Sequence, residues 1–368
     1  MKKAVIWIVV LVLGGSISPS QAQLASQSSP QFSPRPYLSP QHLVTIARGR
    51  RLNVYCNGSG LPIVVLESGY GGDSTAWRYV QQLIAKHTRV CSYDRAGERF
   101  SDPGPYPRDV DAMTSDLHSL VIALSLPNPF VLVGHSMGGM NALLYADKYK
   151  SDLAGLVLLE PGTMYDHVRY STLGEVWTQY LRATTGGFAS LRECYDLASN
   201  LARRDTLLAK CKWRDASYPA ELNQVQDKII ERPNFWKSLL SVDLSLRSTG
   251  DTYRENTLRF FGLTPNLKTP IRDIRSLDQF ELQQSQKQLA SLPLVVVSAA
   301  ERSDPSQPEL IAHAEWSIKN EMYEELTRLS AQARLVTVVD TGHNVRFDQP
   351  ERTAGIILEL VDQVKSHH

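Results

Sequence analysis

Hydrophobic residues along this chain follow two alternating patterns. Short apolar runs are typical of strands in a buried sheet, and apolar residues that recur every three or four positions are typical of amphipathic helices. The segments that predict strands lie at 43–47, 51–56, 62–67, 88–94, 131–134, 153–159, 292–298 and 334–339. The segments with a helical pattern lie at 74–86, 109–124, 137–150, 308–333 and 350–364. Strands that alternate with helices predict an α/β fold with a mostly parallel sheet covered on both faces.

The alternation is interrupted once. It stops near Thr163 and resumes near Leu292, and the residues between are charged, interspersed with aromatic residues and mostly helical in pattern. We therefore expect an inserted, mainly helical cap at 163–290. The two flanking segments, 43–162 and 291–364, would form a single core.

The N-terminal segment has the three parts of a secretory signal peptide. Two lysines precede an apolar run at 4–13, and a small-x-small triplet follows at 20–22. The run is shorter than the ~20 residues needed to span a bilayer, and no cysteine lies near the cleavage site, which argues against a membrane or lipid anchor. We expect residues 1–22 to be removed and 23–42, rich in Ser, Gln and Pro, to be flexible. The mature protein would be exported to a bacterial periplasm or outside the cell.

Composition changes this interpretation little. The chain is 42% apolar and 21% charged with a formal net charge of +1, so no basic excess points to nucleic acid. Its four cysteines form an even set, and export would favour disulfides. Because there is no Cys-x-x-Cys motif and no cluster of Cys and His, the sequence does not predict a metal site.

One segment carries the pattern of a catalytic turn. An apolar run at 131–133 ends at Gly134, and Ser136 stands between Gly134 and Gly138 before a helical pattern begins. This is Gly-x-Ser-x-Gly at a strand-to-helix turn, which exposes a serine hydroxyl for nucleophilic attack. Side chains at 134 and 138 would clash where strand and helix approach each other. The sequence therefore predicts Ser136 as a nucleophile.

In these features the sequence resembles the α/β-hydrolase superfamily. The resemblance covers about 43–162 and 291–364. Its motifs are the turn at 134–139, the Gly-rich loop at 68–73, the turn at 93–97, the strand at 155–159, and Gly342-His343 followed by Asp348-Gln349-Pro350. The resemblance implies a doubly covered, mostly parallel sheet with an inserted helical cap.

The family order of serine, acid and histidine implies that His343 is the base, because it lies in a loop after the last strand. We expect His135, adjacent to the serine, to be structural. The family commonly places the acid after the strand at 292–298, where Asp304 and Glu301 are candidates. Some families place it at the position of Glu160 instead. We rank Glu160 first, Asp304 second and Glu301 third.

The resemblance also assigns supporting roles. The backbone N–H groups of Met137 and Tyr70 would form an oxyanion hole. Asp94 and Arg95 would hold their turn by an ion pair with each other. The cysteine pairs follow from the order of strands in such a sheet and from the cap: we expect disulfides Cys56–Cys91 and Cys194–Cys211.

Together these features predict a cofactor-free serine hydrolase that cleaves an ester or related acyl compound of small size through an acyl-enzyme. Amide, peptide or lactone hydrolysis with the same residues is an alternative. Dehalogenase and epoxide hydrolase chemistry is disfavoured, because those enzymes use a carboxylate nucleophile where this chain has Ser136. A catalytically silent binding protein on the same fold is the alternative from another class.

Overall fold

The computed structural model describes residues 32–106, 108–162, 193–211, 218–247, 289–300 and 309–366. The strands are β1 (His42–Thr45), β2 (Arg51–Asn57), β3 (Val64–Glu67), β4 (Val90–Tyr93), β5 (Phe130–His135), β6 (Leu153–Leu159), β7 (Leu294–Ala299) and β8 (Ala333–Val338). They form one eight-stranded sheet in the order β1-β2-β4-β3-β5-β6-β7-β8. β2 is antiparallel to both of its neighbours, and the strands from β4 to β8 are parallel. The predicted fold class is confirmed.

The α-helices are α2 (Val80–Ile84), α3 (Val110–Ala123), α4 (Met137–Lys148), α7 (Arg204–Lys210), α8 (Ala220–Ile230), α9 (Pro233–Arg247), α12 (Glu309–Thr327), α13 (Val345–Asp348) and α14 (Pro350–Lys365). Short 3-10 helices are η1 (Arg35–Tyr37), η2 (Ala47–Gly49), η3 (Ser74–Trp77), η4 (Lys150–Asp152) and η6 (Leu201–Arg203). The helical pattern at 74–86 thus forms η3 followed by α2.

Local signals explain where the core helices begin. α3 starts after Asp109, whose carboxylate accepts a hydrogen bond from the Ala112 N–H and satisfies one of the unpaired donors of the first turn. α14 starts at Pro350, whose missing N–H and fixed φ suit the first helical position.

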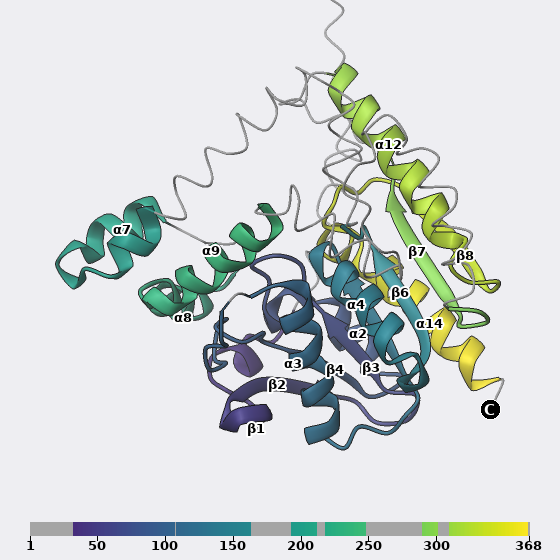
Figure 1. Ribbon diagram of the computed structural model, residues 1–368, viewed down its shortest axis with the longest axis horizontal. Helices are drawn as coiled ribbons and strands as arrows, with labels where there is room; N and C mark the ends of the chain where they lie inside the picture. Colours follow the sequence, from purple (N-terminus) through teal and green to yellow (C-terminus); the bar gives the residue numbers. More distant parts are fainter. Residues whose placement is uncertain are drawn as a thin grey trace, which may run out of the picture. The chain divides into compact units, whose positions relative to one another are not determined.

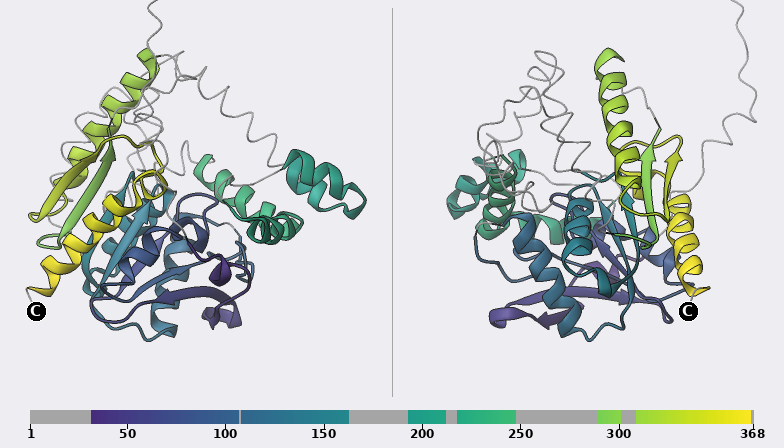
Figure 2. Two further views of the ribbon diagram at one scale, coloured as in Figure 1. Left: turned by 180° about the vertical axis from the view of Figure 1, so that it is seen from behind. Right: turned by 45° about the vertical axis from the view of Figure 1, so that its right-hand side comes forward.

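The central strands are buried on both faces, as their apolar runs predict. In β3, Val64 and Leu66 join one hydrophobic cluster and Val65 joins the other, because successive side chains of a strand point to opposite faces. Helices α2 and α14 complete the first cluster, and α3, α4 and α12 complete the second. Figure 1 shows α3 and α4 on one side of the sheet, and the reverse view in Figure 2 brings α14 forward. Packing on both faces of the sheet therefore holds in place the carboxyl ends of its parallel strands.

Helices α7, α8 and α9 come from the segment predicted as a cap. They reach the core through described contacts. The Tyr218 hydroxyl lies 2.6 Å from the Thr75 hydroxyl, and the Tyr70 hydroxyl donates to the Leu239 carbonyl at 3.1 Å. Much of 163–290 lies outside the described residues, so the domain bounds stay a prediction.

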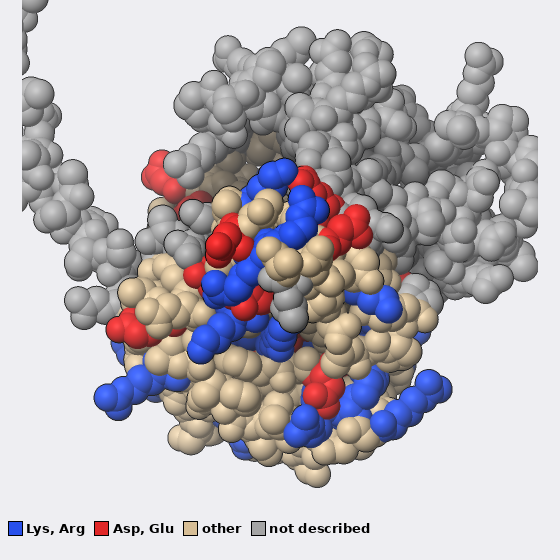
Figure 3. All heavy atoms as spheres, turned by 90° about the vertical axis from the view of Figure 1, so that its left-hand side faces the viewer, with Lys and Arg blue, Asp and Glu red and all other residues tan. Residues whose placement is uncertain are grey.

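Charged side chains of both signs are interleaved on the face drawn in Figure 3. Elsewhere in the described residues, exposed charges of opposite sign also pair, with Arg204 on Glu231 at 2.6 Å and Lys210 on Glu193 at 2.6 Å. Charges so mixed form no extended patch of one sign among the described residues of that face, in keeping with a net charge of +1.

The expected signal peptide at 1–22 and the segment at 23–31 lie outside the described residues. Within the described part of the chain, no helix is long and apolar enough to cross a membrane. Of the segment expected to be flexible, 23–42, the structure describes 32–42, and there one aromatic side chain is buried. Tyr37 in η1 is only 1% exposed, its ring meets that of Tyr55 edge-on at 5.5 Å, and Arg99 donates to its carbonyl. Buried contacts made by this one tyrosine outweigh the polar composition around it.

The four cysteines form two disulfides, with the same pairing as the sequence analysis gave. Cys56 on β2 lies directly opposite Cys91 on β4 in the antiparallel register, and the two are joined. Cys194 is joined to Cys211, the residue that follows α7. The first bridge ties β2 to β4, the second and third strands of the sheet, and the second closes a short segment of the predicted cap.

We expect the paired substitution Cys56→Ser with Cys91→Ser to lower the free energy of unfolding by about 4 kcal/mol, because a 35-residue separation is released in the unfolded chain. Cys194→Ser with Cys211→Ser, at a separation of 17, should lower it by about 3 kcal/mol in urea unfolding. Four titratable thiols in the unfolded, unreduced protein would contradict both bridges.

Candidate active site

The candidate site is built at the carboxyl end of β5, where the chain turns sharply into α4. Ser136 sits in this turn with φ 54° and ψ −125°, a conformation that few residues other than glycine adopt. A Cβ at Gly134 would lie 2.3 Å from the Gly138 carbonyl oxygen, and a Cβ at Gly138 would lie 2.4 Å from the Glu67 carbonyl oxygen. Both glycines are therefore required by close backbone approach.

Backbone hydrogen bonds hold Ser136 in this conformation. Its N–H donates to the Leu159 carbonyl at 3.1 Å, and its carbonyl accepts from Gly139 at 2.8 Å and Gly162 at 2.9 Å. Since Leu159 ends β6, the turn is braced by the neighbouring strand as well as by its own helix.

The structure brings Ser136, His343 and Glu160 together. The Ser136 Oγ lies 2.9 Å from His343 Nε2, and His343 Nδ1 lies 3.4 Å from Glu160 Oε2. His343 stands in the loop between β8 and α13, and Glu160 directly follows β6. The other two acid candidates, Asp304 and Glu301, lie outside the described residues.

Glu160 is a buried carboxylate with several donors around it. It is 1% exposed, its Oε1 accepts from the Ala299 N–H at 2.5 Å, and its Oε2 lies 3.0 Å from Lys319 Nζ. Burial alone would raise the pKa of Glu160, but the hydrogen bond from His343, the charge of Lys319 and the Ala299 N–H together bring the pKa below 4.5. Glu160 is therefore ionised at neutral pH.

Lys319 is a contact that the sequence analysis missed. It lies within α12, and no motif surrounds it. Only the docking of α12 beside the end of β6, where the Tyr323 hydroxyl donates to the Pro161 carbonyl at 3.1 Å, brings this ammonium group to Glu160. No sequence signal would have found it.

His135 supports the loop that carries His343. It is 2% exposed, and its Nε2 donates to the His343 carbonyl at 2.8 Å. Arg346 Nη1 lies 2.6 Å from His135 Nδ1. Burial, then the charges of Arg346 and His343, hold the pKa of His135 well below 6.5, so the ring stays neutral and can accept from one side and donate on the other.

Both residues expected to donate to an oxyanion lie near Ser136 in the chain or in the fold. Met137 is the first residue of α4, so its N–H has no acceptor four residues back in the helix. The loop at 68–72 passes close by, because a Cβ at Gly69 would lie 3.1 Å from the Ser136 Cβ. Tyr70 follows in that loop, and its backbone role stays a prediction.

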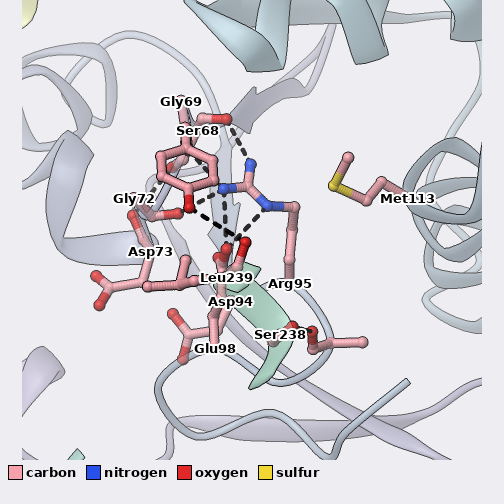
Figure 4. Close-up of polar contacts among 12 residues, drawn as sticks. Ser68, Gly69, Gly72, Asp73, Asp94, Arg95, Glu98, Met113, Ser238 and Leu239 are labelled. Carbon is pink, nitrogen blue, oxygen red and sulfur yellow. Dashed lines mark hydrogen bonds and ion pairs between the residues drawn. The ribbon is translucent and has the colours of Figure 1, made fainter. Parts of the chain in front are cut away.

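Arg95 does not pair with Asp94, and this corrects the sequence expectation. Its guanidinium pairs with Glu67 at 2.8 Å. It also pairs at 3.1 Å with Glu98, which is labelled beside Arg95 and Asp94 in Figure 4. Asp94 instead accepts from Asn53 Nδ2 at 2.8 Å. Adjacent residues in this extended turn point in different directions, so sequence neighbours do not meet. The sequence did offer one indication that Glu67 has a buried partner, because this charged residue ends the apolar run at 62–67.

Glu98 is a buried carboxyl group with a raised pKa. Both Glu98 and Arg95 are 4% exposed, and Glu98 Oε2 has no hydrogen-bond partner among the described residues. Burial raises the pKa of Glu98 to about 7, although Arg95 opposes the shift. The native state therefore holds this proton over a pH range in which the unfolded chain releases it.

We expect Glu98→Gln to gain stability relative to the wild type as the pH rises. Because the native pKa of Glu98, about 7, lies above its ordinary 4.5, the wild type loses stability between about pH 4.5 and 7. The measurement is urea unfolding of both proteins at pH 5 and at pH 8. Between these two pH values, the free energy of unfolding of the variant minus that of the wild type should rise by about 2–3 kcal/mol. Glu359→Gln, at an exposed position on α14, is the control. A shift of the opposite sign, or none, would contradict the assignment.

Among the residues that the structure describes, no three His, Cys, Asp or Glu side chains are grouped so as to hold a metal ion.

Comparison with known proteins gives a consistent result. A family model described as "Alpha/beta hydrolase family" matches residues 63–356. Protein YqjL of Bacillus subtilis is 36% identical over 104 residues, which is 28% of this chain and 41% of that protein. Monoacylglycerol lipase ABHD6 of Homo sapiens is 26% identical over 190 residues, 51% of this chain and 55% of that protein. The chain spans about 40% of the length of the first curated relatives it matches.

Solved structures with the same fold include a putative lipase from Acinetobacter baumannii. It has a TM-score of 0.57 and 19% sequence identity, and the match covers 96% of this chain and all of that one. At this identity the likeness concerns the fold alone.

Proposed function

Since this chain belongs to the alpha/beta hydrolase family, we propose that it is a hydrolase that cleaves an ester or related acyl compound through an acyl-enzyme on Ser136. The observation that carries the proposal is the contact series from Ser136 Oγ to His343 Nε2 at 2.9 Å and from His343 Nδ1 to Glu160 at 3.4 Å. A nucleophile, a base and an acid in this order form the arrangement used for acyl transfer.

In the proposed reaction, Ser136 Oγ attacks the substrate carbonyl carbon while His343 Nε2 takes its proton. The carbonyl oxygen becomes an anion, held by the N–H groups of Tyr70 and Met137, each worth about 3 kcal/mol of barrier. Collapse breaks the bond to the leaving group, which receives the proton from His343. Water, deprotonated by His343, then attacks the acyl-enzyme, and Ser136 regains its proton as the acid is released.

Glu160 is the acid we assign to this reaction. It is ionised at neutral pH, so it can stabilise the imidazolium that forms on His343 in each half-reaction. Its buried position fixes the carboxylate behind the ring. The 3.4 Å contact of Glu160 Oε2 with His343 Nδ1 supports this assignment, and Asp304 and Glu301 lie outside the described residues.

A small ester is the substrate class that fits best. One relative is named as a monoacylglycerol lipase and one fold neighbour as a putative lipase, and both names refer to ester cleavage. The N-terminal pattern at 1–22 and the two disulfides support export as a further part of the proposal.

We expect a fluorophosphonate probe to label the wild type covalently and to leave Ser136→Ala unlabelled, because only an activated serine hydroxyl reacts. On 4-nitrophenyl butyrate the variant should lose about 10⁴-fold to 10⁶-fold in kcat. Ser101→Ala, with a buried serine in the Arg95 turn, controls for general reactivity. Labelling that persists in Ser136→Ala would exclude Ser136 as the nucleophile, and a wild type without labelling would favour a silent scaffold.

The acid is tested by comparing three amide substitutions. Glu160→Gln should lose about 10⁴-fold in kcat, because an amide cannot stabilise the imidazolium. Asp304→Asn and Glu301→Gln should retain most of the activity. If the loss concentrates in either of these two, Glu160 is not the acid.

A further inference from the structure

The two proposed oxyanion donors belong to different parts of the fold. The Tyr70 N–H is in the loop at 68–72, which follows β3, and the Met137 N–H opens α4. A shift of about 1 Å between reacting or stabilising groups can reduce a rate by roughly 10²-fold. The reaction therefore requires something that fixes the loop relative to α4.

Arg95 binds the loop at 68–72 through its backbone carbonyl groups. Its guanidinium donates to the carbonyl oxygens of Ser68 at 2.5 Å, Gly69 at 2.5 Å and Gly72 at 3.1 Å. Figure 4 shows this side chain reaching into the loop, with Glu98 beside it. Since these carbonyls lie before and after Tyr70 in the chain, the guanidinium fixes the backbone on both sides of the proposed donor.

Glu67 connects Arg95 to α4. Its Oε1 accepts from Arg95 Nη1 at 2.8 Å and from Asn141 Nδ2 at 2.9 Å, and the Tyr93 hydroxyl donates to its other oxygen. Glu67 is fully buried and Asn141 is 1% exposed. Asn141 lies four residues after Met137, which places it one turn along the same side of α4. A continuous buried network thus runs from the loop to the helix that carries the second donor.

We propose that Arg95, acting through Glu67 and Asn141, is a positioning residue that sets the spacing of the two oxyanion donors. This inference rests on the proposed function. Arg95 touches neither the nucleophile nor the base, so its effect reaches the reaction only through the loop and α4.

The chemistry of the side chain explains why arginine stands here. A planar guanidinium offers five N–H donors in fixed directions and can bond several carbonyls and two carboxylates at once. A lysine at 95 would keep the positive charge between Glu67 and Glu98 but could not reproduce this geometry. Arg95→Lys therefore separates the positioning effect from simple charge balance.

The test uses a readout specific for the oxyanion hole. 4-Nitrophenyl butyrate is compared with its thiono analogue, in which sulfur replaces the acyl carbonyl oxygen and is the weaker hydrogen-bond acceptor. A hole with correctly spaced donors favours the oxoester. We expect Arg95→Lys and Asn141→Leu to lower kcat on the oxoester about 10-fold to 100-fold, with little change in KM. The thionoester should lose far less, so the oxoester-to-thionoester ratio should fall about 10-fold.

Arg50→Lys is the matched control, because it alters a largely buried arginine paired with Asp116 on α3 and should leave the ratio unchanged. If both variants fold by circular dichroism and lose oxoester and thionoester activity equally, Arg95 has a structural role only and the proposal is wrong. Should Arg95→Lys fail to fold, Asn141→Leu decides in the same way, since it cuts only the link to α4. A wild type that neither turns over the oxoester nor reacts with a fluorophosphonate overturns the proposed function, and this inference with it.

Discussion

The close approach of three backbones at the end of β5 is the constraint on which the rest of the site depends. β3, β5 and α4 meet so tightly that a single methyl group at Gly134 or Gly138 would overlap main-chain atoms. This packing forces Ser136 into a left-handed conformation, and hydrogen bonds to the end of β6 keep it there. Glu160 directly follows the same strand, so the strained conformation of Ser136 and the position of the proposed acid both depend on the end of β6.

Buried charge is the second constraint at this edge of the sheet. Glu67 ends β3 and Glu160 follows β6, and both carboxylates are buried and accept hydrogen bonds from several donors. An unpaired buried charge would destabilise the fold by several kcal/mol, whereas a fully hydrogen-bonded one is tolerated and fixes geometry. Glu98 differs, because one of its oxygens has no hydrogen-bond partner among the described residues and its pKa rises to about 7. The edge therefore combines fully hydrogen-bonded carboxylates with one carboxyl group that changes charge near neutral pH.

The sequence was sufficient for those features that depend on local pattern. Apolar periodicity predicted the sheet, and the glycine spacing around Ser136 predicted the turn, because both are properties of neighbouring residues. The link between Arg95 and Glu67 was not predicted, since it depends on where side chains point in a turn. Lys319 was missed because only helix packing brings it to Glu160. Burial of Tyr37 was missed for the same reason: a single long-range contact outweighs local composition.

Lys319 has two opposite effects on Glu160, the carboxylate that contacts His343. Glu160 Oε2 lies 3.0 Å from the ammonium group and 3.4 Å from His343 Nδ1, so one oxygen serves both cations when the ring is protonated. The permanent charge keeps the carboxylate ionised and in place, which favours the correct orientation of the ring. It also offsets part of the negative charge that would stabilise an imidazolium. In the proposed reaction, Lys319 would therefore strengthen the positioning of the carboxylate and weaken its electrostatic stabilisation of the imidazolium.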